Sequence, residues 1–230
     1  MPGSALITGG TGGLGAAVTR AFLDGGWRVV VPLYDEGERE RVESHEQLVL
    51  EPADLLDPAS AAAIVELAAT EPAAPLGAVV NLVGGFEMGG RVHETPIDDF
   101  EAQLRLNLRP TYIVTHAALP HLQTAGGGAV VCVSARAALR PFSGASGYAV
   151  SKAAVLAFVD VLAAEYKDDA IRVNAILPSV IDTPANRRSM PDSDHERWVA
   201  PEQIARVVRF LCEDGAAAVS GAHVPVYGRA

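Results

Sequence analysis

A glycine-rich segment near the start of the chain constrains the fold most. It reads Thr8-Gly9-Gly10-Thr11-Gly12-Gly13-Leu14-Gly15 and separates a short apolar stretch, residues 4–8, from a helical pattern over residues 16–24. Gly25 and Gly26 end that pattern, and residues 27–33 read as a second strand. Glycine lets the backbone turn tightly and approach a ligand, and a helix start attracts phosphate groups. The segment therefore predicts a strand–helix–strand unit that binds a nucleotide.

The rest of the chain continues this alternation of strands and helices. Further strands are expected at residues 48–50, 78–83, 129–133, 172–177 and 222–226, and helices at 58–70, 96–122, 146–166 and 201–213. Pro110 is expected to kink the long helix. Strands separated by helices throughout predict a mostly parallel sheet with helices on both faces, in one domain spanning residues 1–230.

Length and charge narrow the classes of function. A chain of 230 residues suits one α/β domain, and its formal charge of -10 argues against binding DNA or RNA. Cys132 and Cys212 are too few for a disulfide framework, and the histidines lack ligand spacing, so no metal site is expected. Neither a membrane span nor a signal peptide is evident. We expect a cytoplasmic protein that binds a small molecule.

Tyr148 and Lys152 lie four residues apart within the helix expected at 146–166. Residues at this spacing share one helix face, about one turn apart. An ammonium group beside a phenol favours its ionised form, so Lys152 is expected to lower the pKa of Tyr148. The pair is a candidate for proton transfer.

Five motifs, in order along nearly the whole chain, resemble those of the short-chain dehydrogenase/reductase family. Residues 8–15 match its T-G-x-x-x-G-x-G pattern, and Tyr148 to Lys152 match its Y-x-x-x-K pattern. The other three are Asn81-Leu82-Val83-Gly84-Gly85, Asn107-Leu108, and the stretch from Arg172 to Pro178 that continues as Ile181-Asp182-Thr183-Pro184.

The resemblance implies a Rossmann-type doubly wound sheet in three α/β/α layers that binds NAD or NADP. Tyr148 is then the proton donor or acceptor, Lys152 binds the nicotinamide ribose, and Asn107 helps to hold a water in a proton relay. Asp54 and Leu55 fall at the adenine, and Thr183 near the carboxamide. The implied cofactor-binding residues are Gly9, Thr11, Gly13, Leu14, Gly15, Asp35, Asp54, Leu55, Asn81, Val83, Gly84, Tyr148, Lys152, Pro178, Ile181 and Thr183.

One position departs from the family pattern. The family's catalytic serine lies thirteen residues before the tyrosine, and here that residue is Ala135. Ser134 is adjacent, but neighbouring residues of a strand point to opposite faces. Ser143 and Ser146 are the alternative sources of a hydroxyl in the substrate site. Losing one donor to a developing oxyanion costs roughly 10²- to 10³-fold in rate.

Dihydropteridine reductases carry alanine at this position, and two segments resemble theirs. These are Gly84-Gly85-Phe86, which places Phe86 in the substrate site, and residues 182–191 followed by Asp194 and Trp198. A conjugated imine depends less on a serine donor than a ketone does. The segment 184–200 lacks apolar periodicity, and is either an exposed loop or a lid that selects the substrate.

The choice between NAD and NADP depends on the end of the second strand. Leu33 cannot bind a ribose hydroxyl, and Asp35 is the nearest carboxylate, which favours NAD slightly. Arg39 and Arg41 are alternative phosphate ligands, but glutamates surround them and favour local ion pairs.

Two classes of function follow from these features. The first is a reductase or dehydrogenase of a carbonyl, alcohol or conjugated imine. The second is a non-catalytic dinucleotide-binding redox sensor or scaffold on the same fold. The apolar residues of 146–166 cover more than one narrow stripe, which predicts burial on two sides and, with the resemblance, a homodimer or homotetramer.

Overall fold

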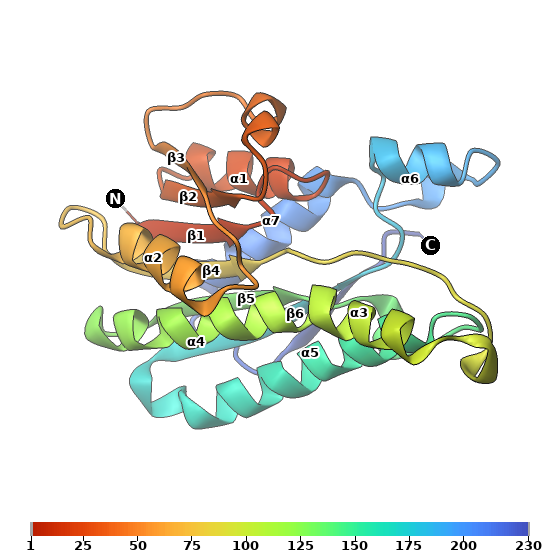
Figure 1. The fold of residues 1–230 in the computed structure, drawn as a ribbon. Helices are drawn as coiled ribbons and strands as arrows, with labels where there is room; N and C mark the ends of the chain where they lie inside the picture. The colour runs from red at the N-terminus through yellow and green to blue at the C-terminus, as the bar shows by residue number, and fades with distance from the viewer. Residues whose placement is uncertain (1, 230) are drawn as a thin grey trace.

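The computed structural model describes residues 2–229 and contains one seven-stranded parallel sheet (Figure 1). Its order is β3-β2-β1-β4-β5-β6-β7, so the chain starts in the middle and fills first one half and then the other. The strands are β1 (Ser4–Thr8), β2 (Arg28–Leu33), β3 (Leu48–Pro52), β4 (Leu76–Asn81), β5 (Gly128–Val133), β6 (Ile171–Pro178) and β7 (His223–Val226). Every predicted strand is present, with ends that differ by at most two residues.

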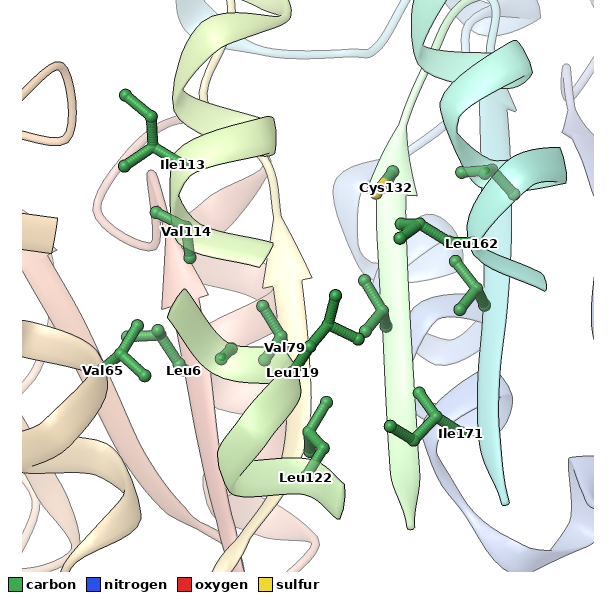
Figure 2. Packing of buried hydrophobic residues seen from close by; sticks show 14 of the residues in the cluster. Leu6, Val65, Val79, Ile113, Val114, Leu119, Leu122, Cys132, Leu162 and Ile171 are labelled. Atoms are coloured by element: carbon green, nitrogen blue, oxygen red, sulfur yellow. The ribbon is translucent and has the colours of Figure 1, made fainter. Parts of the chain in front are cut away.

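Helices cover both faces of the sheet, as the alternating pattern predicts. One face carries α2 (Pro58–Ala69), α4 (Arg109–Thr124) and α5 (Ser146–Glu165), with α3 (Ile97–Asn107) packed against α5. The other face carries α1 (Gly15–Asp24) and α7 (Pro201–Cys212), which pack against each other. Figure 2 shows the first interior, where Leu6, Val79 and Cys132 of the sheet meet Leu119 and Leu162 of the helices.

The long helix expected over residues 96–122 is two helices. α3 ends at Asn107 and α4 begins at Arg109, with Leu108 between them. Pro110 is the second residue of α4. The first amides of a helix have no partner within it, so a proline at this position breaks no helical hydrogen bond. The proline therefore starts a new helix instead of kinking a continuous one.

The segment 184–200 is partly helical. It contains α6 (Pro184–Ser189) and a short 3₁₀ turn at His195–Arg197. A bridge between Ile181 and Val199 closes its base. Figure 1 shows α6 at one end of the molecule, separate from the helices that flank the sheet.

By length and composition, one helix within residues 2–229 could cross a membrane. This is α5, with 20 residues and a mean hydropathy of 1.6. The sequence-based expectation that no apolar stretch has the length of a membrane span is therefore wrong. Its apolar residues Val155, Leu156, Val159 and Leu162 are buried in the first interior. Packing against the sheet accounts for its composition.

Candidate active site and dinucleotide pocket

A cavity of about 710 Å³ lies at the carboxyl ends of the central strands. In a doubly wound sheet, this edge is where ligands bind, because the connections leave β1 and β4 toward opposite faces. Its lining includes most of the predicted site residues: Gly9, Thr11, Gly13, Leu14, Gly15, Asp54, Leu55, Val83, Gly84, Phe86, Tyr148, Lys152, Pro178 and Ile181.

The glycine turn at the end of β1 is too close-packed for side chains. Gly9 has a φ of +66°, and a Cβ on Gly15 would lie 1.9 Å from the Gly9 carbonyl oxygen. A Cβ on Gly13 would lie 2.9 Å from Cγ2 of Thr183. The turn thus brings the first residues of α1 to the cavity, and amides in the first turn of a helix attract phosphate groups. This cradle fits the pyrophosphate of a dinucleotide.

Lys152 is 4% exposed, and its ammonium group donates to the backbone carbonyl of Val133 at 3.1 Å. An ammonium carries three donors, so two further hydrogen bonds are possible on the cavity side. Burial lowers the pKa of Lys152 to about 8. A buried amine on the cavity wall fits the hydroxyl groups of a ribose.

Tyr148 lies on the same face of α5, half-buried against Phe86. The two rings meet edge to face with centroids 4.9 Å apart. Burial raises the pKa of Tyr148 to about 12. The expected lowering by Lys152 is therefore not found in this structure, because desolvation of the phenol dominates and the ammonium group of Lys152 is bonded to Val133.

Asn107 is 1% exposed and does not line the cavity. Its Oδ1 accepts a hydrogen bond from the Gly85 amide at 3.1 Å, and its Nδ2 donates to the Gly85 carbonyl at 3.1 Å. A Cβ on Gly84 would lie 2.6 Å from Asn107 Oδ1 and 2.9 Å from Lys152 Nζ. Asn107 and Lys152 therefore flank the same glycine, and Asn107 fixes the backbone just before Phe86.

Ala135 lines the cavity where the family pattern has serine. The neighbouring Ser134 points its hydroxyl elsewhere, donating to the Lys152 backbone carbonyl at 2.7 Å. Ser143 is exposed and outside the cavity, and Ser146 lines a separate small hollow beside Met88. The structure thus does not bring either predicted substrate-site serine into the cavity, because Ser143 lies in the exposed turn before α5 and Ser146, the first residue of α5, faces the separate hollow.

Three predicted cofactor residues also lie outside the cavity lining. Asp35 caps a 3₁₀ turn by accepting from the Gly37 amide at 2.7 Å. Asn81 is buried and donates to the Thr115 hydroxyl at 3.0 Å. Thr183 caps α6, although its methyl group faces Gly13. Asn81 and Thr183 therefore support the walls, whereas Asp35 is directed to its own turn.

Sequence reasoning did not place every lining residue in the site, and two that it left out, Tyr34 and Glu38, lie at the end of the cavity near β2. Glu38 lies on the 3₁₀ turn Glu36–Arg41, five residues beyond the end of β2. The local ion pair expected there is present, because Arg41 donates to Glu38 at 3.0 Å. The contact of the same carboxylate with Thr11 joins segments 27 residues apart, and no local pattern indicates it. Within residues 2–229, no cluster of three metal-ligating side chains is present.

The sheet order, the glycine turn and the buried lysine at one cavity define a nicotinamide-dependent oxidoreductase. A family model described as Enoyl-(Acyl carrier protein) reductase matches residues 9–228. The chain belongs to the short-chain dehydrogenase/reductase family, and is an NAD(P)-dependent enzyme of that family.

Relatives of known name extend over nearly the whole chain. D-threitol dehydrogenase of Mycolicibacterium smegmatis is 30% identical, covering 97% of this chain and 91% of its own. 2-(R)-hydroxypropyl-CoM dehydrogenase of Xanthobacter autotrophicus is 29% identical, and the match covers 97% of this chain and 96% of the relative. Protein FixR of Bradyrhizobium diazoefficiens is 32% identical, and the match covers 97% of this chain and 84% of the relative.

Solved structures agree with the fold. ElxO with NADP bound superposes with a TM-score of 0.92 at 24% identity, covering 99% of this chain and 98% of that chain. The 3-ketoacyl-(acyl-carrier-protein) reductase from Brucella melitensis, complexed with NADH, has a TM-score of 0.88 at 27% identity, covering 99% and 98%. These two neighbours carry different dinucleotides.

Proposed function

We propose that this chain is a reductase of a small carbonyl or conjugated imine compound, with Tyr148 as the proton donor. The observation that carries the proposal is the placement of Tyr148, Lys152 and the glycine turn on one cavity. A phenol whose pKa lies near 12 is protonated at neutral pH, as a proton donor for reduction must be. A nicotinamide bound in the cavity supplies the hydride.

Other residues of the chain bind the dinucleotide and position the groups around it. The amides of Gly13, Leu14 and Gly15 bind the pyrophosphate, and Lys152 donates to the ribose hydroxyls. Asn107 positions the backbone before Phe86 and sits beside Lys152 at Gly84, where a water would complete a proton relay. Asp54 and Leu55 bind at the adenine end, and Thr183 beside the carboxamide.

The substrate side of the cavity is apolar and aromatic. Phe86 packs on Tyr148, and on its other side lies Phe142, with the ring centroids of the two phenylalanines 6.1 Å apart. Phe86 is 54% exposed and Phe142 is 49% exposed. Ala135 offers no hydroxyl to a substrate oxygen. These features favour a planar acceptor that stacks on rings and depends little on a second donor, such as a dihydropterin or another conjugated imine. The segment 184–200 closes over it as a lid.

The test compares wild type with Tyr148→Phe. NADH and NADPH oxidation is measured with a dihydropterin, an imine panel and a ketone panel, and dinucleotide affinity by calorimetry. We expect turnover with at least one acceptor, lost in the variant with affinity retained. Dinucleotide binding without turnover on any acceptor would instead identify a redox sensor or scaffold.

We also propose a cytoplasmic homodimer or homotetramer. The outer faces of α4 and α5 carry Tyr112, 53% exposed, with Phe158 at 5.5 Å between centroids, beside an open groove. Exposed aromatic groups in a groove suit burial against another copy. Light scattering on wild type and Tyr112→Glu tests this, and a monomeric wild type would contradict it.

A further inference from the structure

The carboxylate of Glu38 is held at one end of the cavity. Its side chain is 17% exposed and lines the cavity beside Thr11 and Tyr34. Its Oε2 accepts from the Thr11 hydroxyl at 3.1 Å and from the Tyr34 amide at 3.2 Å. Glu38 thus bridges the glycine turn after β1 and the loop after β2.

Arg41 completes the arrangement by donating to Oε1 of Glu38 at 3.0 Å. A carboxylate accepts about four hydrogen bonds, so with three donors in place one position remains for a further donor. This position lies where the end of β2 meets the glycine turn. In a doubly wound dinucleotide fold, that is where the hydroxyls of the adenosine ribose bind.

We propose that Glu38, not Asp35, selects the dinucleotide, and that it selects NAD(H) over NADP(H). A ribose 2′-hydroxyl donates to the fixed carboxylate. A 2′-phosphate would place about two negative charges against it, and like charges disfavour each other at close range. The proposal needs only dinucleotide binding, so it can fail or hold independently of the role of Tyr148.

The cations near this end are already engaged. Arg39 donates to the Leu50 carbonyl at 2.9 Å and pairs with Glu36, and Arg41 pairs with Glu38. Among the cavity-lining residues of the described chain, Lys152 is the single cation, and it lies beside Val133 at the nicotinamide end. A 2′-phosphate would therefore have to break an ion pair to find a partner.

Asp35 provides a matched control. It is the N-cap of the 3₁₀ turn that carries Glu38 and is likewise acidic, but its carboxylate accepts from the Gly37 amide and it does not line the cavity. Replacing either carboxylate by its amide removes one negative charge from the same segment. The two substitutions differ in whether the lost charge faces the cavity.

The experiment is calorimetric binding of NADH and NADPH to wild type, Glu38→Gln and Asp35→Asn. We expect wild type to bind NADH at least about tenfold tighter, which is a difference of about 1.4 kcal/mol. Glu38→Gln should lose most of this preference, chiefly by gaining affinity for NADPH, while Asp35→Asn keeps it. Thermal unfolding of each protein without ligand checks that the turn remains folded.

Three results would overturn the proposal. They are equal binding of the two dinucleotides by wild type, an unchanged preference in Glu38→Gln, and a loss of preference in Asp35→Asn as large as in Glu38→Gln. Arg41→Met adds a further test. If NADPH recruits Arg41, this variant loses NADPH affinity selectively, and Glu38 is then not the dominant charge at this end.

Discussion

The hydroxyl of Ser134 donates a 2.7 Å hydrogen bond to the backbone carbonyl of Lys152. This bond joins the end of β5 to α5, the helix that carries both Lys152 and Tyr148. It also directs the hydroxyl toward the helix backbone and away from a substrate. Ala135, the next residue, lines the cavity without a donor. The missing serine is therefore not replaced by its neighbour.

Restoring that serine should increase ketone reduction. We expect Ala135→Ser to raise kcat/KM for ketones by up to about 10²-fold, because a hydroxyl there stabilises the developing oxyanion. Reduction of conjugated imines should change much less. Steady-state kinetics on both acceptor classes measures this, with Ser143→Ala, outside the cavity, as a control of unchanged activity. An equal gain for both classes would show that the hydroxyl acts on something other than the carbonyl.

The depressed pKa of Lys152 should make stability depend on pH. Below about pH 8 the amine is protonated in both the folded and unfolded states, and burial of the charge is unfavourable. Between pH 8 and 10.5 the unfolded chain keeps a proton that the folded protein has released. The free energy of unfolding therefore rises with pH across this window, by about 3 kcal/mol at most.

Denaturant unfolding of wild type and Lys152→Met across that window checks the prediction. Burial raises the pKa values of Tyr148 and Cys132, which lowers stability above about pH 9 in both proteins. Lys152 lowers the pKa of Cys132 by its charge, so the comparison is made in a Cys132→Ala background, in which this coupling is absent. We expect wild type to gain stability relative to Lys152→Met as pH rises from 8 to 10.5. A difference that stays constant with pH would show that the folded amine titrates normally.

The glycine turn should tolerate a methyl group at one position and not at another. Gly15→Ala places a Cβ 1.9 Å from the Gly9 carbonyl oxygen, and we expect a loss of about 3 kcal/mol or more because backbone must move. Gly12→Ala brings its Cβ to 3.3 Å of the same oxygen and should cost less than about 1 kcal/mol. Chemical denaturation compares them; similar losses would argue against the close packing of the turn.

Asn107 should affect activity through the backbone it holds. Asn107→Ala leaves the amide and carbonyl of Gly85 without their partner, at a cost of about 1–3 kcal/mol. The loop that carries Phe86 then moves, and we expect kcat to fall and KM to rise. Thr111→Ala removes a buried hydroxyl that donates to the backbone carbonyl of Asn107, but leaves both bonds from the Asn107 side chain to Gly85 in place, so it should affect stability alone. Unchanged kinetics in Asn107→Ala would exclude this role.

Local patterns determined most of the architecture. The seven strands follow from short apolar runs between helical segments, and glycines at 9, 13 and 15 mark a turn that only a residue without Cβ can form. The spacing of Tyr148 and Lys152 places both on one helix face, whatever that helix packs against. These features depend on residues near each other in the chain, so they can be read without the tertiary structure.

Long-range packing decided what the residues of the site do. Burial on α5 raised the pKa of Tyr148, where its spacing from Lys152 alone predicted a decrease. The folding of the turn after β2 brought Glu38 to Thr11, 27 residues away in sequence, and left Asp35 to cap its own turn. Desolvation and contact between distant segments are properties of the folded chain, because they depend on which surfaces meet and exclude water.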